Sequence, residues 1–162
     1  SNRLKQDKQI LKLIPKKIIK KPVTIDKKEA LRIVKKDGYK IDTLPTHFKK
    51  DREITLAAVK TNGMILNWID ASFKKDKEIV LHVVKKCGDF LEEIDDSLKK
   101  DKEIVLAAVK EDGYALRYAD KSLKKDKEVV IAAIKENDMA LQFSHKSLWK
   151  DPDILAILNK KK

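Results

Sequence analysis

The stretch DKEIVLAAVKEDGYALRYADKSLKK, residues Asp101–Lys125, is one copy of a repeat that decides the fold. Its first aspartate recurs every 25 residues, and the lysine nine positions after it recurs with the same period. All four glycines of the chain occupy one position of the repeat. The recurring residues are Asp26, Asp51, Asp76, Asp101, Asp126 and Asp151, then Lys35, Lys60, Lys85, Lys110, Lys135 and Lys160, and Gly38, Gly63, Gly88 and Gly113. A fixed period of this length is typical of tandem repeat proteins, in which each unit packs mainly on its neighbours.

Each unit carries the signals of two helices. The aspartate is a favourable N-cap, the acid that follows suits the positive helix end, and the later lysine suits the negative end. The apolar run Ile104–Val109 forms more than one stripe, which indicates neighbours on more than one side. Glycine is expected to end this first helix (101–111) in a left-handed conformation, which Asp138 also tolerates in the fifth unit. A shorter second helix is expected at 114–120, followed by a turn at 122–125.

These elements predict an all-α fold, an α-solenoid-like tandem array of 25-residue two-helix repeats. The five full units of residues 26–150 are 26–50, 51–75, 76–100, 101–125 and 126–150. Residues 1–25 are expected to form a degenerate, basic capping unit, because Pro15 falls where the other units have a helix-interior residue. Residues 151–162 begin a truncated sixth unit. Ser1 is atypical of a natural start, so we expect the chain to be a piece of a longer protein.

The repeat resembles one known family. The residues that carry the likeness are DKEIVL at 76–81, DKEIVLAAVK at 101–110 and GYALRYA at 113–119. They are similar to the uncharacterised family catalogued as domain of unknown function 4116, over roughly residues 26–158. The first unit departs from the pattern at 28–30 and the third at 89–93. The resemblance implies tandem helical repeats, and it implies no established activity and no site residues.

The net charge of +12 is concentrated near the N-terminus. Residues 1–25 carry +7 and residues 26–50 carry +4, whereas residues 51–150 sum to zero. Paired lysines could form a ladder that meets phosphates, but an aspartate follows each pair, so a solvated, self-neutralising edge is the simpler interpretation; the pairs are Lys49-Lys50, Lys74-Lys75 and Lys99-Lys100. The segment 10–21 is either an amphipathic, membrane-surface stretch or part of the packing of the first unit.

The first and fifth positions of the second helix are expected to share one face, one α-helical turn apart. They give a candidate interaction face of Tyr39, Met64, Trp68, Asp89, Glu93, Tyr114, Tyr118, Met139 and Phe143. Aromatic side chains beside charges are typical of protein recognition surfaces. Alternatively, the aromatic rings fill gaps between adjacent units, and the third unit is shifted so that Phe90 packs instead. The seventh position of the first helix varies in polarity, as a groove edge would: Arg32, Ala57, His82, Ala107 and Ala132.

No constellation for chemistry is evident. His82 and Cys87 do not have zinc-ligand spacing, the glycines are isolated, and Cys87 has no base near it in sequence, so we expect no enzyme, cofactor or metal. No apolar run is long enough to span a membrane. A single cysteine fits an intracellular, reducing compartment. We therefore expect a non-catalytic helical-repeat scaffold that mediates protein–protein interaction through a protein or peptide partner. The alternative is a helical repeat array that binds nucleic acid, specifically RNA.

Overall fold

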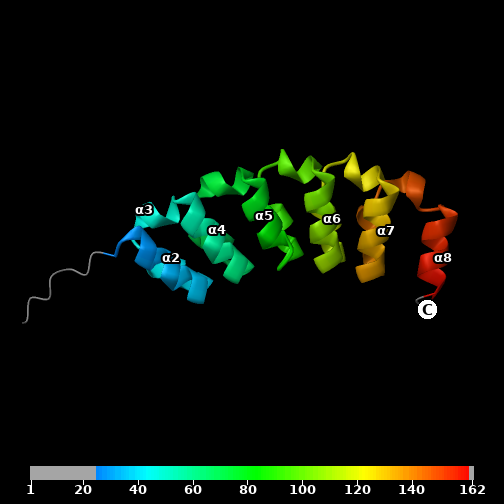
Figure 1. Cartoon of the computed structure of the whole chain (residues 1–162). Coiled ribbons are helices and arrows are strands. Elements are labelled where there is room, and N and C mark those ends of the chain that lie inside the picture. The colour runs from blue at the N-terminus through cyan, green and yellow to red at the C-terminus, as the bar shows by residue number, and fades with distance from the viewer. Residues whose placement is uncertain (1–24, 161–162) are drawn as a thin grey trace, which may run out of the picture.

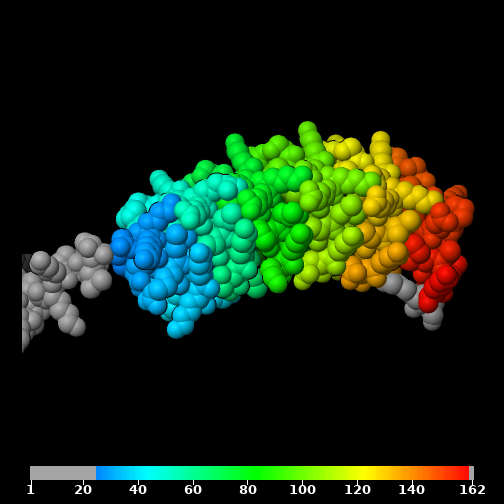
Figure 2. All heavy atoms as spheres, in the orientation of Figure 1, coloured from blue at the N-terminus to red at the C-terminus, as the bar shows by residue number. Residues whose placement is uncertain are grey.

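The computed structural model describes residues 25–160 and is an α-solenoid. One α-helix opens each unit, and these helices lie side by side in chain order along a gently curved row (Figure 1). Their bounds are α2 Lys27–Lys36, α4 Arg52–Thr61, α5 Lys77–Val84, α6 Lys102–Glu111, α7 Lys127–Glu136 and α8 Pro152–Lys160. Figure 2 shows the units as consecutive bands along the molecule. The predicted all-α tandem array is confirmed, and the described residues contain no strand. The predicted capping unit lies outside the described residues, except for Ile25.

The second helix of each unit is a 3-10 helix, where an α-helix was predicted. In the fourth unit it runs over Gly113–Tyr118 (η6), shorter than the expected 114–120. Asp112 caps it by accepting the Tyr114 N–H, 2.9 Å away. An Asp side chain that accepts from the N–H two residues later favours a tight turn, and 3-10 geometry is common in helices this short. The equivalents are η1 Gly38–Thr43, η2 Gly63–Trp68, η4 Gly88–Glu92 and η8 Asp138–Phe143.

A last short turn of helix leads back to the next unit. It is α3 Thr46–Lys49 in the first unit, then η3 Ala71–Lys75, η5 Leu98–Lys100, η7 Leu123–Lys125 and η9 Lys146–Leu148. Here backbone hydrogen bonds connect neighbouring units. The Asp95 N–H donates to the Lys74 carbonyl at 3.0 Å, and the Asp120 N–H donates to the Lys99 carbonyl at 3.1 Å. These bonds set the register between units.

The glycines do not have the predicted left-handed conformation, because no described glycine has a positive φ. They are needed for a close approach between units instead. A Cβ on Gly113 would lie 2.4 Å from the backbone oxygen of Ala133 in the next α-helix, and a Cβ on Gly88 would lie 2.4 Å from that of Ala108. Asp138 occupies this position in the fifth unit and is exposed. Only the absence of a side chain allows the internal units to pack this closely.

The core runs through the array because each internal α-helix packs against the units on both sides of it. In α5, Ile79 and Val83 pack with the preceding units, whereas Val80 and Val84 pack with the following ones. All four side chains are fully buried. The two apolar stripes expected from the sequence therefore serve two neighbours, and no unit has a core of its own.

Candidate functional site

The nine predicted interface residues lie on or directly after the 3-10 helices, and none of them is buried. Tyr39, Met64, Trp68, Asp89 and Met139 are exposed, and Glu93, Tyr114, Tyr118 and Phe143 are half-buried. The two positions within one unit do not share a face as they would in an α-helix. A 3-10 helix has three residues per turn, so residues four apart point in directions that differ by about 120°.

The aromatic rings meet between units. Tyr39 of the first unit contacts Trp68 of the second, with ring centroids 5.1 Å apart and planes tilted by 58°. Tyr114 of the fourth unit contacts Phe143 of the fifth edge-on, at 5.9 Å. The rings thus fill gaps between units and also stay partly accessible, with Tyr39 42 % and Trp68 38 % exposed. These contacts agree with the interpretation that the rings fill gaps between units, and a recognition role for their accessible parts stays a prediction.

Ion pairs connect the acidic third unit to the second and fourth units. Lys74 of the second unit donates to Glu93 at 3.1 Å, and Arg117 of the fourth unit lies 3.8 Å from Asp89. Tyr118 hydrogen-bonds to Glu92, and this bond, with some burial, raises the pKa of the phenol. Phe90 is half-buried and packs against the core of the first units. These acids therefore interrupt the aromatic face and link three units electrostatically.

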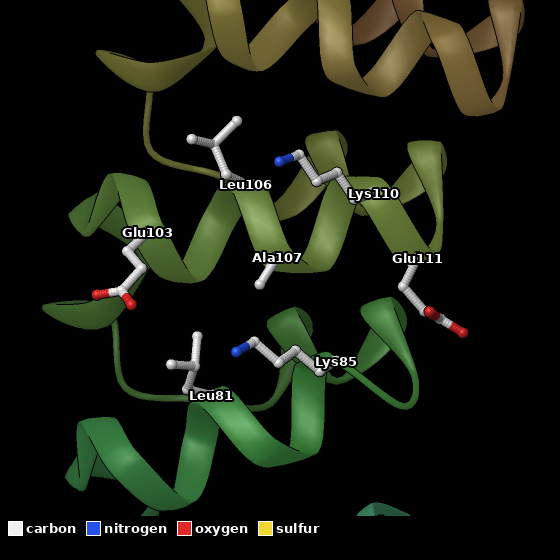
Figure 3. A pocket seen from close by; sticks show the side chains of 7 residues that line it. All are labelled: Leu81, Lys85, Glu103, Leu106, Ala107, Lys110 and Glu111. Carbon is white, nitrogen blue, oxygen red and sulfur yellow. The ribbon is translucent and has the colours of Figure 1, made fainter.

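A second surface, on the outer side of the α-helices, has a more regular form. A groove of about 400 Å³ lies between α5 and α6 (Figure 3). Leu81 projects into it from α5 and Ala107 faces it from α6, with Lys85 beside Leu81. The other lining residues are Glu103, Leu106, Lys110 and Glu111. We call this the α5–α6 groove. It combines an apolar floor with two lysines, Lys85 and Lys110, and has an acid at each end, Glu103 and Glu111.

The same groove recurs along the array. Between α6 and α7 it is lined by Leu106, Lys110, Glu128, Ile131, Ala132, Lys135 and Glu136. Between α2 and α4 it is lined by Leu31, Lys35, Glu53, Leu56, Ala57, Lys60 and Thr61. The boundary between α4 and α5 differs, because His82 replaces the alanine and Lys60 donates to Glu78 at 3.3 Å. The seventh helix position, predicted as a groove edge, does lie on this surface.

The leucines of this surface were not among the candidate residues predicted from the sequence. They occur at 25-residue spacing and precede the recurring lysine by four residues, which places both on one side of an α-helix. The row is Leu31, Leu56, Leu81, Leu106 and Ile131, and all five side chains are half-buried. That spacing was the signal for a repeated groove.

Ion pairs connect every pair of neighbouring α-helices. The basic residue after each capping aspartate reaches the capping aspartate and the following acid of the next unit. Lys77 Nζ lies 2.7 Å from Asp101 and 2.9 Å from Glu103. Four further sets repeat the pattern: Lys27 with Asp51 and Glu53, Arg52 with Asp76 and Glu78, Lys102 with Asp126 and Glu128, and Lys127 with Asp151 and Asp153. We call these sets the charge ladder.

Five of the six paired lysines of the first three units also form ion pairs with carboxylates. Lys49 lies 2.9 Å from Asp42, Lys75 lies 3.6 Å from Asp95, and Lys99 lies 2.9 Å from Asp96. Lys50 and Lys74 are paired with Asp70 and Glu93. Positive charge along this edge is therefore largely balanced within the protein.

The charge ladder should make the stability of the fold depend on pH in the acidic range. Asp51, Asp76 and Asp101 each accept a hydrogen bond from the preceding unit's basic residue, which lowers the pKa of the carboxyl below its ordinary value of 3.8. Such a carboxyl stabilises the fold above the unfolded-state pKa of about 3.9, and this contribution is lost as the pH falls through the folded-state pKa. We therefore expect the urea midpoint to be steady from about pH 7 to 5 and to fall below about pH 4.

A matched variant separates the ladder from the other carboxylates. Asp76→Asn keeps an N-cap acceptor but cannot titrate, so its midpoint should fall less than that of the unaltered protein between about pH 5 and 3. Equal falls in the two proteins would contradict a role for the ladder.

Within residues 25–160 no group of three or more His, Cys, Asp or Glu side chains could hold a metal ion. Cys87 is half-buried and unpaired with another cysteine. No helix in this part of the chain is long and apolar enough to cross a bilayer.

Comparison with protein families gives three matches to one family, described as Domain of unknown function (DUF4116), at residues 26–74, 76–124 and 104–149. The chain belongs to the DUF4116 family. The first two DUF4116 matches each take in nearly two 25-residue units, and together the matches cover the five units that carry the solenoid. The predicted resemblance is confirmed over 26–149. No curated protein and no solved structure matches the chain.

Proposed function

We propose that this DUF4116 array is a non-catalytic scaffold that binds an extended protein segment across the outer side of its α-helices. The observation that carries the proposal is the recurrence of one groove, with the same leucine, lysine, glutamate and alanine positions, at three boundaries between α-helices. A repeated lining suits a long ligand that meets the same chemistry at each step.

The dimensions of the array predict the pattern of the ligand. Packed α-helices lie about 8–10 Å apart, and a chain in the extended polyproline II conformation rises about 3.1 Å per residue with about three residues per turn. A segment of this kind that crosses the helices therefore directs about every third side chain at successive grooves. An apolar residue at every third position would contact successive leucines.

The charged side chains beside the leucines predict which residues the ligand carries between its apolar positions. Lys85, Lys110 and Glu111 form no ion pair with any of residues 25–160, whereas Glu103 is already paired with Lys77, so the unpaired charge of the lining is positive. The free positive charge beside the apolar floor favours glutamate or aspartate in the ligand. The partner is therefore an acidic segment with regularly spaced apolar side chains.

The alternative of RNA binding is less well supported. Phosphate contacts require cations that are not already neutralised, and the paired lysines of the first three units lie against carboxylates. The groove also offers leucine and alanine, where aromatic platforms would suit unpaired bases better. Binding of RNA in place of the peptide is one of the outcomes that the experiment below distinguishes.

A synthetic peptide with leucine at every third position and glutamate between tests the proposal by fluorescence anisotropy. We expect weak, saturable binding, with Kd of about 10–100 μM. Charge reversal of the groove by Lys85→Glu with Lys110→Glu should weaken binding about tenfold. Lys150→Glu alters an exposed lysine outside the grooves and should change Kd by less than about twofold.

A shuffled peptide of the same composition is the control for the spacing. Equal affinity for the two peptides would overturn the proposal, as would unchanged binding by the charge-reversed variant. Binding of an RNA oligonucleotide that falls steeply with salt, without binding of the peptide, would instead favour the alternative.

A further inference from the structure

One hollow, between the fourth and fifth units, is lined by three lysines and by no acidic residue. It has a volume of about 380 Å³ and is lined by Lys121, Lys124, Lys125, Phe143, Ser144 and His145. We call it the unit-five hollow. None of its three lysines forms an ion pair with a carboxylate among residues 25–160.

The equivalent hollow one unit earlier provides an internal comparison. Its lining residues are Asp96, Lys99, Lys100, Tyr118, Ala119, Asp120, Lys121 and Lys124, the last two of which also line the unit-five hollow. There Asp96 pairs with Lys99 at 2.9 Å, and the charge of Lys100 contributes to the lowered pKa of Asp120. Two of the four lysines that line this hollow thus interact with aspartates.

Both aspartates are replaced in the unit-five hollow. Lys121 stands at the repeat position of Asp96, and His145 stands at that of Asp120. The two lysines of the repeat remain as Lys124 and Lys125. At these two repeat positions the unit-five hollow gains one cation and loses two anions. Its lining therefore has three lysines and no acidic residue, whereas the lining of the preceding hollow includes two aspartates.

The polar groups that remain are arranged for an anion. Among residues 25–160, Lys124 Nζ donates to the backbone oxygen of Arg117, and burial lowers the pKa of its ammonium more than the nearby Asp120 raises it. His145 Nδ1 accepts the Ser147 N–H at 3.2 Å and lies 2.8 Å from Ser147 Oγ. An external anion would supply the charge that the two lost aspartates supply elsewhere.

The ring of Phe143 gives the hollow an apolar wall. Its edge-on contact with Tyr114 fixes its position, and it remains half-buried. A ligand with a flat apolar stem could lie against this ring while its anionic end reaches the lysines.

We propose that the unit-five hollow binds an aryl phosphate, the group that a phosphorylated tyrosine side chain carries. A phosphate monoester has a charge between −1.5 and −2 near neutral pH and strong acceptor oxygens, which match three ammonium groups better than a single carboxylate would (about −1). The aromatic stem matches Phe143. The proposal concerns one ligand group and does not depend on peptide binding in the α-helix grooves.

Titration of the full chain with phenyl phosphate, followed by NMR of the backbone amides, tests this assignment. We expect saturable shifts at Ser144 and His145 with Kd of about 1 mM or tighter at low salt. Methyl phosphate lacks the stem and should bind about fivefold more weakly. The double variant Lys121→Asp with His145→Asp introduces the two aspartates that the preceding hollow has at these repeat positions and should weaken binding by about tenfold or more.

The reciprocal exchange gives a gain of function. Asp96→Lys with Asp120→His should create a second phosphate site between the third and fourth units, with new shifts near Tyr118 and Ala119. Absence of saturable shifts with phenyl phosphate would overturn the proposal, and so would unchanged affinity in the Lys121→Asp/His145→Asp variant. Equal affinity for phenyl phosphate and chloride would show only general attraction of anions and would also overturn it.

Discussion

Gly113→Ala is expected to destabilise the array by about 2 kcal/mol or more, although alanine is normally the better residue at a negative φ. Replacement of glycine by alanine gains about 0.4–1 kcal/mol through the unfolded chain where the backbone permits it. Here the new Cβ would lie 2.4 Å from the Ala133 carbonyl oxygen, so the fourth and fifth units would have to move apart. Overpacking of this kind costs about 1–3 kcal/mol and at times more.

Thermal unfolding measures the effect, with an expected fall in Tm of about 5–10 °C for a chain of this size. Asp138→Ala is the matched control, because this position of the repeat already carries a side chain in the fifth unit and is exposed. It should change stability by less than about 0.5 kcal/mol. A Tm for Gly113→Ala at or above that of the unaltered protein would show that the units can separate at little cost.

Ile104→Ala should destabilise the array by about 3 kcal/mol, within the range of about 2–5 for a fully buried isoleucine. Ile104 lies in the middle of the array and has no exposed surface, so the deletion leaves a cavity between units that pack on both sides. In a repeat protein the loss of one internal interface weakens the cooperation of all units across it. Urea unfolding gives the magnitude, and amide hydrogen exchange gives the extent along the chain.

Ile154→Ala is the matched comparison, since Ile154 occupies the same repeat position in α8 and is equally buried. Among the described residues α8 has a neighbouring α-helix on one side only. Its variant should speed amide exchange in α8 and leave the exchange of α5 and α6 nearly unchanged. Faster exchange throughout α5 and α6 in the Ile154 variant would contradict one-dimensional coupling between units.

The period and the first helix could be predicted because their signals are local. A capping aspartate, an apolar run and a lysine in the last turn lie within eleven residues of one another. The second helix was expected to be α-helical because few residues, as in GYALRY at 113–118, cannot separate a period of 3.0 from one of 3.6. A better signal was the Asp or Asn before the glycine position, which caps the 3-10 helix through Asp37, Asn62, Asp112 and Asn137.

The remaining differences depend on contacts between units, which no single repeat contains. The need for Gly113 arises from Ala133, and the ring of Tyr114 packs on Phe143. In both cases the partners are twenty or more residues apart in the sequence. The candidate face on the 3-10 helices was placed correctly near the surface, but its pairing across units, and the leucine grooves on the α-helices, required the spacing of neighbouring units to be known.

The charge ladder has a consequence for how such arrays can change in length. Each unit offers a basic side chain to the unit that follows and a pair of acids to the unit before it, so every joint is directional and has the same form. Duplication or deletion of any 25 consecutive residues within the array would recreate a joint of this form at the new junction. A change of any other length would set unlike positions against each other. Gene duplication in steps of one unit could therefore lengthen the scaffold without the invention of a new interface.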